Sequence, residues 1–288
     1  MMNLSELTIP YDNKTIIKIF CILIIIILVL ISLLWCYSKL TLNNRNCINM
    51  NYLYRNFPPL TNTKNTQYKL RDYYVKSAYN CCAPGGYNHN FVNICALKNC
   101  IKQGARCLDF QIYSVNNEPV VAVSSVSDFS VKGSYNSIKF SSAMNIISDY
   151  AFSGSTCPCP KDPLIIHLRI MTNNTTILDN IANILQNVLK NKLLGKEYSY
   201  EYHSTNIGLV ELNKLLGKAI IVVDKSLVNP GKSNLDEYIN ITSNSAFMRC
   251  TRFRDIKYSP DTEEITNFNK KNMTISLPDI SAKPNNPS

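Results

Sequence analysis

Gly104-Ala105-Arg106-Cys107-Leu108-Asp109-Phe110-Gln111-Ile112-Tyr113 is the stretch around which the rest of the chain can be placed. Gly104 ends a helical pattern, and the residues after it predict a buried strand. Asp109 and Gln111 lie two positions apart, so their side chains project from the same face of that strand. Because a buried face with two polar groups needs hydrogen-bond partners or a solvent-filled site, these two residues are the first candidates for a site.

Strands and helices alternate on both sides of this stretch. Strands are predicted at 73–80, 118–123, 163–169, 219–224, 247–256 and 273–277, and helices at 90–104, 137–152, 176–194 and 209–216. Asn116-Asn117 is predicted as a turn. The alternation favours an α/β fold with a parallel sheet, and periodicity does not distinguish an open, doubly wound sheet from a closed barrel.

The composition favours a folded protein without a nucleic-acid partner. The 288 residues are 45% hydrophobic, which is enough for a sizeable core, and the formal net charge is +10. The basic residues are scattered and form no Lys/Arg block with interleaved aromatic residues. We therefore interpret the charge as a generally basic surface rather than as a nucleic-acid interface.

An apolar segment near the N-terminus predicts a membrane anchor. Residues 19–37 carry no charge, and as a helix they measure about 28 Å, close to the hydrocarbon thickness of a bilayer. We expect a polar tail (1–14), a transmembrane signal anchor (15–37), an Asn/Thr-rich tether (38–68) and one folded domain (69–288). A cleaved signal peptide is the alternative, but no stretch of small residues suited to cleavage follows Trp35.

The side of the membrane is suggested by cysteines and glycosylation sequons. The cysteines after the anchor are Cys47, Cys81, Cys82, Cys95, Cys100, Cys107, Cys157, Cys159 and Cys250, and the sequons begin at Asn173, Asn174, Asn240 and Asn272. Both features favour a lumenal or extracellular domain of a single-pass membrane protein. Basic residues flank both ends of the anchor, so charge gives almost no bias. The cysteine pairing is not determined, although Cys95 and Cys100 on one helix should not pair with each other.

Three blocks of sequence, in order and spacing, resemble the X domain of phosphatidylinositol-specific phospholipase C. They are SAYN (77–80), KQGARCLD (102–109) followed by EPVV (118–121), and ISDYAF (147–152) followed by PLIIHL (163–168). GKAII (217–221) is similar to a later strand of that family. The resemblance covers about residues 70–288. It implies a distorted (β/α)8 TIM-like barrel with its site at the carboxyl ends of the strands.

The family resemblance also implies a chemistry, phosphoric diester hydrolysis in lipid metabolism. Two histidines shuttle protons, and in eukaryotic-type members a Ca²⁺ held by oxygen ligands neutralises the phosphate. This chain departs from that pattern at both histidine positions, which are occupied by Tyr79 and Val123. Loss of one positioned acid or base lowers a rate roughly 10²–10⁴-fold, and neither tyrosine nor valine replaces imidazole near neutral pH.

The calcium-ligand positions are substituted as well. Asn80 is retained, Asp109 replaces a glutamate, Gln111 replaces an aspartate and Arg169 replaces the last glutamate. The charge of the site has therefore moved toward positive, and we expect no metal and no other cofactor there. Asn80, Asp109, Gln111 and Arg169 remain candidate ligand-binding residues, and Asn80 and Asp109 are relics of the metal site.

Our leading hypothesis is a membrane-anchored pseudoenzyme of this family. It would contact the lipid bilayer and bind a phosphoinositide, another phosphodiester or a protein partner. The alternative is an active, metal-independent phosphodiesterase with a rearranged site, for which His167, Arg169 and His89 are the catalytic candidates. The competing interpretations are a core histidine for His167, a salt bridge to Asp109 for Arg169 and a surface residue for His89.

Two further expectations concern the cysteines and the C-terminus. Cys81, Cys82, Cys157 and Cys159 offer four thiolates for a zinc site, but Cys81 follows a strand and Cys159 precedes one, which places them at opposite ends of a barrel. Residues 277–288 resemble the segment before the family's final strand. We therefore expect a sequence that stops short of that strand or a barrel that lacks it, with unpaired edges.

Overall fold

The computed structural model describes residues 12–55, 58–86, 88–124, 131, 133–199, 206–226, 231 and 233–278. It divides the chain into two compact units, Met1–Asn44 and Arg45–Ser288. Most of the polar tail and most of the segment after Leu277 lie outside the described residues.

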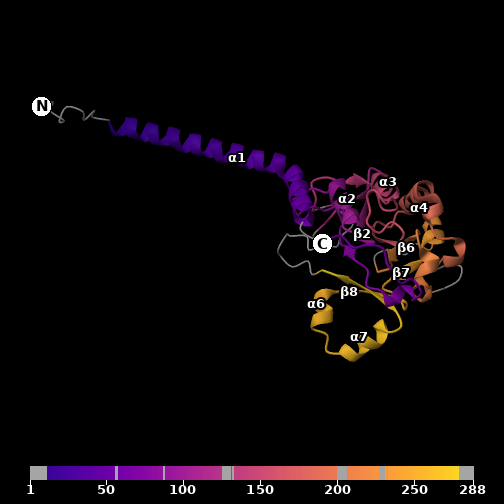
Figure 1. Ribbon diagram of the computed structural model, residues 1–288. Coiled ribbons are helices and arrows are strands. Elements are labelled where there is room, and N and C mark those ends of the chain that lie inside the picture. Colours follow the sequence, from indigo (N-terminus) through magenta and orange to yellow (C-terminus); the bar gives the residue numbers. More distant parts are fainter. Residues whose placement is uncertain are drawn as a thin grey trace. The chain divides into compact units, whose positions relative to one another are not determined.

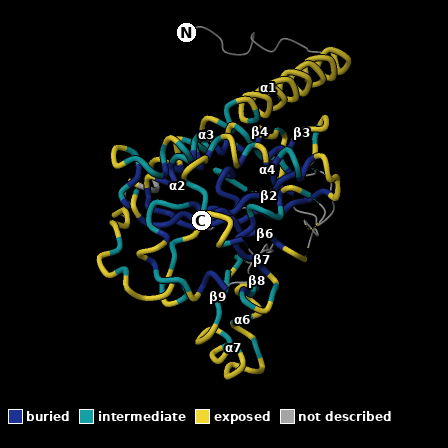
Figure 2. Tube along the Cα trace, turned by 90° about the vertical axis from the view of Figure 1, so that its right-hand side faces the viewer, coloured by how far each residue is buried: buried dark blue, intermediate teal, exposed yellow. Residues whose placement is uncertain are grey.

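Helix α1 (Asn13–Arg55) is long and apolar enough to cross a membrane, a test that a signal sequence also passes. Its apolar side chains between Ile16 and Tyr37 are exposed (Figure 2). Two hydroxyl side chains bond back along the helix, Ser32 Oγ to the Leu28 carbonyl at 2.8 Å and Thr41 Oγ1 to the Tyr37 carbonyl at 2.9 Å. The hydroxyl groups of Ser32 and Thr41 therefore find their acceptors within the helix itself.

The structure differs from the expected tether at residues 38–55, which continue α1. Within the second unit the end of the helix is held by tertiary contacts, since Cys47 forms a disulfide with Cys95 and Met50 is buried. Asn46 Nδ2 also donates to Asn90 Oδ1 at 2.7 Å. These contacts override the weak helical period of the sequence.

Strand β2 (Cys107–Val115) confirms the predicted strand and is labelled in Figure 1. It lies inside a seven-stranded sheet of order β4-β3-β2-β5-β6-β7. The other strands are β1 (Ser77–Ala78), β3 (Glu118–Val121), β4 (Ile138–Lys139), β5 (Leu164–Met171), β6 (Ala219–Asp224) and β7 (Ile241–Ser243). Strand β1 also pairs with β2, and β1, β2, β5, β6 and β7 run parallel to one another. Strands β8 (Met248–Arg252) and β9 (Met273–Leu277) form a separate parallel pair.

The sheet is mixed because Asn116 and Asn117 make a hairpin. Both residues have positive φ angles, 50° and 62°, which is the backbone of a two-residue turn between antiparallel strands. Strand β3 accordingly runs antiparallel to β2, and β4 runs antiparallel to β3. The expectation of a wholly parallel sheet was wrong at this edge, although the turn itself was predicted.

Three helices lie close to their predicted positions, α2 (Ile94–Lys102), α3 (Phe140–Tyr150) and α4 (Thr175–Leu189). Two further helices, α6 (Phe253–Lys257) and α7 (Thr262–Asn269), were not predicted. Asn93 caps α2, because its Oδ1 accepts from the Cys95 backbone N–H at 2.8 Å, so the helix begins a few residues after the predicted start at residue 90. Residues 209–216 form no α-helix but parts of two short 3₁₀ helices, Ile207–Leu209 and Leu212–Leu215. The strand predicted at 247–256 ends at Arg252, where α6 begins.

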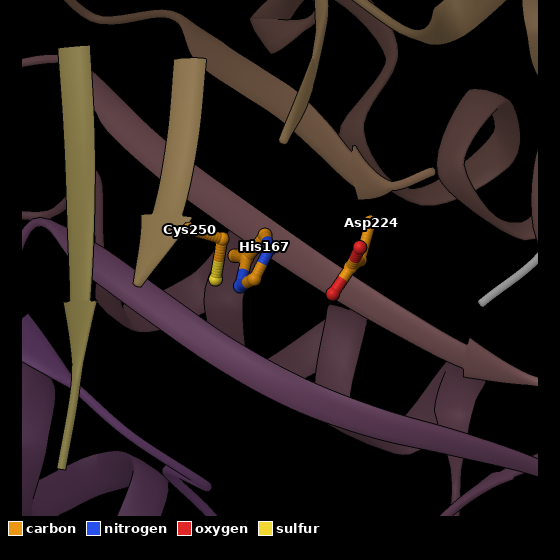
Figure 3. Close-up of side chains that lie close together, drawn as sticks. All are labelled: His167, Asp224 and Cys250. Atoms are coloured by element: carbon orange, nitrogen blue, oxygen red, sulfur yellow. The ribbon is translucent and has the colours of Figure 1, made fainter. Parts of the chain in front are cut away.

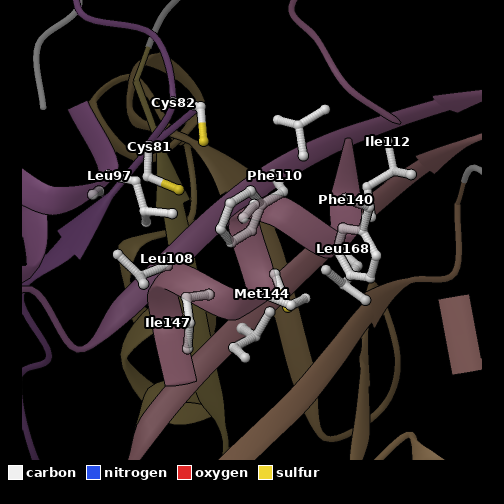
Figure 4. Close-up of a cluster of buried hydrophobic side chains, with 14 of the residues drawn as sticks. Cys81, Cys82, Leu97, Leu108, Phe110, Ile112, Phe140, Met144, Ile147 and Leu168 are labelled. Carbon is white, nitrogen blue, oxygen red and sulfur yellow. The ribbon is translucent and has the colours of Figure 1, made fainter. Parts of the chain in front are cut away.

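Successive side chains of β2, β5 and β6 point to opposite faces of the sheet, and the two faces differ in composition. One face packs against helices α2, α3 and α4 and forms the largest hydrophobic core (Figure 4), with Leu97, Leu108, Phe110, Ile112, Phe140, Met144, Ile147 and Leu168 among its buried members. The opposite face, which we call the inner face, carries the alternate residues Cys107, Asp109, Gln111, Ile165, His167, Arg169, Val222 and Asp224. The polar residues of the sequence analysis therefore share this second face.

The sheet is open within the part of the chain that the structure describes. Strand β7 pairs with β6 alone, and β8 and β9 pair only with each other. A cavity of about 420 Å³ lies between residues 70–77 and the segment 269–276 that includes β9. The fold is thus α/β, and the hydrogen bonding of these strands does not close a barrel.

Two glycines with left-handed backbones offer a test of this packing. Gly104 has φ 77° and Gly217 has φ 69°. A Cβ at Gly104 would lie 3.0 Å from the Leu60 carbonyl oxygen, whereas at Gly217 no described atom lies within 4 Å. We expect Gly217→Ala to lower the free energy of unfolding by about 1 kcal/mol and Gly104→Ala by a further 1–3 kcal/mol, roughly, because only the latter also crowds the backbone. Denaturant unfolding of the full chain in detergent measures both, and equal losses would contradict the contact.

Candidate functional site

The inner face brings the predicted site residues together through strand register. Strands β2 and β5 are parallel, with Asp109 opposite His167 and Gln111 opposite Arg169. Tyr79 and Asn80 follow β1, which pairs with the other side of β2. The site is therefore built at the point where three neighbouring strands meet.

Arg169 and Asp109 form a bidentate ion pair at its centre. Arg169 Nε donates to Asp109 Oδ1 at 2.9 Å, and Arg169 Nη2 donates to Oδ2 at 2.6 Å. The same Nη2 donates to Asn80 Oδ1 at 2.6 Å, and the Asn80 backbone N–H donates to Asp109 Oδ2 at 3.0 Å. Arg169 is 6% exposed and Asp109 4%. The two charges thus neutralise each other away from solvent.

His167 is enclosed beside this pair. Its Nδ1 lies 2.8 Å from Asp109 Oδ1 and its Nε2 lies 3.0 Å from Ser243 Oγ. The side chain has no solvent exposure. Because a carboxylate only accepts hydrogen bonds, His167 Nδ1 must carry the proton that it donates to Asp109. In that tautomer Nε2 accepts a hydrogen bond from the Ser243 hydroxyl.

Tyr79 covers the guanidinium of Arg169. The Arg169 Cζ lies 4.5 Å from the centre of the Tyr79 ring, a cation–π contact. Burial raises the pKa of the Tyr79 hydroxyl above its usual value, although the charge of Arg169 opposes this shift. The phenol therefore stays protonated at neutral pH and provides no base.

The charges of the pair set the pKa values of both partners. Burial by itself raises the pKa of Asp109, but the Arg169 charge and the hydrogen bond from His167 outweigh it and hold that pKa well below its usual range. Burial likewise opposes the charge of Arg169, whose pKa is nevertheless raised by Asp109. Asp109 and Arg169 are therefore both ionised throughout the neutral range.

The remaining candidates lie around this centre or away from it. Gln111 is opposite Arg169 in register, but its Oε1 accepts from the Ser124 backbone N–H at 3.2 Å. Val123 is buried just after β3. His89 lies in an exposed loop, where its ring centre is 6.1 Å from that of Tyr135. The structure gathers Tyr79, Asn80, Asp109, His167 and Arg169, with Gln111 at the edge.

A second cluster adjoins His167 and was missed in the sequence. His167, Asp224 and Cys250 each present one ligand atom, and these atoms all lie within 4.8 Å of one another (Figure 3). Asp224 ends β6, so its place at a strand terminus is a signal that sequence reasoning had available. Cys250 lies in β8, and only the fold brings that strand to the inner face. Burial and the nearby carboxylates of Asp224 and Asp109 raise the pKa of the Cys250 thiol to about 12.

The four cysteines considered for a zinc site lie at different ends of β2. The Cys81 backbone N–H donates to the Asp109 carbonyl oxygen, whereas Cys159 Sγ donates to the Gly104 carbonyl oxygen. Cys157 Sγ and Cys159 Sγ are 3.9 Å apart, and the hydrogen bond from Cys159 lowers the pKa of Cys157 to about 6, with help from Arg106. Among the described residues the disulfide is Cys47–Cys95, and Cys100 keeps its thiol.

A cavity of about 220 Å³ lies at the amino ends of the strands rather than at this site. Arg106, before β2, and Pro163, before β5, line it together with residues 60–63 and 73–76. The Arg106 guanidinium in the wall of this cavity donates hydrogen bonds to the backbone carbonyls of Ala151, Asp162 and Pro163. In barrels of this type the reaction takes place at the opposite, carboxyl ends of the strands.

The ion pair predicts an acid-dependent stability. Because the folded pKa of Asp109 lies below the unfolded value of about 3.9, its ionised form stabilises the native protein above that pH, and the contribution is lost as pH falls toward the folded pKa. Asp109→Asn leaves Arg169 buried without its counter-ion, so we expect a loss of about 3–5 kcal/mol at neutral pH.

Denaturant unfolding from neutral pH down to about pH 2 measures both effects. Below about pH 4 the difference between the parent and Asp109→Asn should shrink. The control is Asp149→Asn, since Asp149 is exposed on α3 and its replacement should change the free energy of unfolding by less than about 0.5 kcal/mol. A constant difference between parent and Asp109→Asn at all pH values would refute the assignment.

Solved phospholipase C structures share this fold. PLC21 from L. pealei matches with 15% identity and a TM-score of 0.59, covering 76% of this chain and 32% of its own. PLC21 from S. officinalis matches with 16% identity and a TM-score of 0.58 over the same shares. A calcium-dependent phosphoinositol-specific phospholipase C from a Pseudomonas species aligns with 10% identity and a TM-score of 0.48, covering 76% of this chain and 94% of its own. The chain thus spans about a third of the length of the two PLC21 chains.

The sequence itself identifies the family. No curated protein sequence matches the chain. The family model "Phosphatidylinositol-specific phospholipase C, X domain" matches residues 66–225, which is more than half of the chain. That range contains β1 to β6 and the Asp109–Arg169 pair. The chain therefore belongs to the phosphatidylinositol-specific phospholipase C X-domain family.

Proposed function

We propose that this protein is a membrane-anchored phospholipase C X domain that has lost phosphodiester hydrolysis and acts by binding a ligand or a partner. The family supports a phosphodiesterase-like or phospholipase-like ancestry for the site. One observation supports the loss of activity. The Arg169 guanidinium is only 6% exposed and its hydrogen bonds go to Asp109 and Asn80, so it is not presented to a substrate.

The residues at the family's calcium positions do not fit a calcium ion. Ca²⁺ takes six to eight oxygen ligands, several of them carboxylates. Here both Asp109 oxygens and Asn80 Oδ1 accept hydrogen bonds from Arg169, and Gln111 Oε1 accepts one from a backbone N–H. The positive guanidinium of Arg169 is bonded to the oxygens of Asp109 and Asn80 that would be needed for the ion, so no catalytic step is assigned to a metal here.

The two positions at which the family has catalytic histidines hold no group that can act as acid or base near neutral pH. Tyr79 stacks on Arg169 with a raised pKa, and Val123 has no titratable group. Each lost acid or base lowers the rate roughly 10²–10⁴-fold, so two such losses leave little of a phosphodiesterase. The alternative is a metal-independent enzyme with His167 as its base, and the hydrogen bond from His167 to Asp109 is the observation that favours it. The complete burial of His167 counts against this role because a base must reach the proton it removes.

The membrane anchor is proposed from α1. Its apolar side chains are exposed over the length that a bilayer requires, and its backbone is satisfied within the helix. We place the X domain on the lumenal or extracellular side, a choice that the Cys47–Cys95 disulfide supports because such bonds persist in oxidising compartments. The bilayer is then a partner, and a phosphoinositide, another phosphodiester or a membrane-bound protein is the class of ligand within reach.

Lipid hydrolysis provides the direct test. The full chain in phosphatidylinositol-containing vesicles should release no inositol phosphate above background, with or without Ca²⁺, because the oxygen ligands and the bases are blocked. The positive control is an active phospholipase C in the same vesicles. Turnover that disappears in His167→Ala but persists in His89→Ala would overturn the proposal and establish the rearranged site.

Carbonate extraction of membranes tests the anchor. The double substitution Ile25→Arg with Leu28→Arg should release the protein from the membrane pellet. Each arginine at the centre of a bilayer raises the free energy of insertion of the helix by about 2.5–3.5 kcal/mol. Matched substitutions near the end of the segment, Ser38→Arg with Asn43→Arg, should leave it in the membrane pellet. If the mature protein lacks residues 1–37, as N-terminal sequencing can determine, the segment is a cleaved signal and the anchor is refuted.

A further inference from the structure

The cluster of His167, Asp224 and Cys250 presents a nitrogen, an oxygen and a sulfur ligand to one point. Their ligand atoms lie within 4.8 Å of one another, a spacing that a small side-chain movement converts into the coordination shell of a single ion (Figure 3). The three residues come from β5, β6 and β8, so the site draws on both sheets. His167 and Asp224 are buried and Cys250 is half-buried, which leaves the cysteine side as the entry path.

Asp109 orients the histidine for this purpose. Its Oδ1 accepts from His167 Nδ1 at 2.8 Å, and this fixes the tautomer in which Nε2 keeps its lone pair. A carboxylate on the far nitrogen of a metal-binding histidine is the usual way in which proteins fix the ring and increase its basicity. Asp109 is in turn held by Arg169, so the orienting group is itself immobilised.

Asn244 positions the other two ligands. Its Nδ2 donates to Asp224 Oδ1 at 2.9 Å, and its Oδ1 accepts from the Cys250 backbone N–H at 3.3 Å. Ser226 adds two bonds to the same Asp224 Oδ1, from its backbone N–H at 2.9 Å and its hydroxyl at 2.7 Å. All three of these bonds go to one oxygen of the carboxylate, which leaves Oδ2 to serve as the ligand atom.

Ser243 contacts the histidine of this cluster. Its hydroxyl lies 3.0 Å from His167 Nε2, the atom that would bind an ion. A metal ion must displace this single hydrogen bond, whose net contribution to stability is small. The displaced hydroxyl then stands beside the fourth coordination position, where it can contact the ion or a water molecule bound to it.

We propose that His167, Asp224 and Cys250 bind a divalent transition-metal ion of the zinc class. Imidazole, thiolate and carboxylate together suit Zn²⁺ or Co²⁺, whereas Ca²⁺ and Mg²⁺ avoid sulfur and take oxygen ligands. Three protein ligands leave one position of a tetrahedral ion open. The site uses none of the family's calcium positions as a ligand, and it does not depend on whether the X domain hydrolyses lipids. Binding replaces the thiol proton of Cys250 with the ion.

Cobalt titration of the chelator-treated full chain in detergent tests this site. Four-coordinate Co²⁺ with a thiolate ligand gives a charge-transfer band in the near ultraviolet and strong visible bands. We expect both to saturate at one equivalent, to be removed by Zn²⁺ and to resist excess Ca²⁺. Cys250→Ala should abolish the charge-transfer band, and Asn244→Ala should weaken Co²⁺ binding roughly 10–100-fold, because it releases the two ligands that Asn244 holds.

Controls separate this site from adventitious thiol binding. Cys100→Ala removes another buried cysteine and should leave the titration unchanged. Bands that survive in Cys250→Ala, or that vanish in Cys157→Ala, would assign the ion to the Cys157–Cys159 pair and overturn the proposal. Absence of any band in the parent protein would also overturn it. Since a core substitution can disturb folding, Cys250→Ser is titrated in parallel, and only variants with the circular dichroism and unfolding midpoint of the parent are compared.

Discussion

The buried ion pair of Asp109 and Arg169 is the constraint on which the rest of this site depends. Two charges removed from water are tolerated only when they meet with good geometry and when their remaining hydrogen-bonding groups are satisfied. Here the guanidinium forms both bonds to the carboxylate and one to Asn80, and Tyr79 covers its face. His167 donates a further hydrogen bond to the Asp109 carboxylate. Arg169 on β5 thus holds in place Asp109 on β2 and the two residues that follow β1, Tyr79 and Asn80.

Much of the fold follows from local sequence patterns. The apolar runs of β2, β5 and β6 are strands covered on both faces, and their alternation correctly places Asp109 and Gln111 on one face. The antiparallel edge was not predicted, because Asn116-Asn117 was interpreted only as a turn and not as a hairpin with two positive φ angles. The helical end of α1 was not predicted either, since it depends on the distant partners Asn90 and Cys95.

The sequence predicted those parts of the site that lie in the family motifs or on neighbouring parallel strands, and it did not predict the others. The pairing of parallel β2 with β5 puts His167 opposite Asp109 and Arg169 one inward-facing position further along, next to Gln111. The contact of Arg169 with Asp109 agrees with the salt bridge that the sequence analysis considers for this arginine. The contact of His167 with Ser243 and Cys250 depends on β7 and β8, whose positions no local pattern gives. A cysteine in a short strand carries no signal of its own, so only the assembled inner face shows it beside a histidine.

The disulfide between Cys47 and Cys95 has a consequence for the loop that it closes. It joins residues 48 positions apart, and the enclosed chain contains β1 with Tyr79 and Asn80. Closing this loop restricts the unfolded chain, and reduction of the bond would restore chain entropy worth roughly 2–4 kcal/mol to the unfolded state. The redox potential of the surrounding compartment thus sets how much the bond adds to the stability of the unit that carries Tyr79 and Asn80.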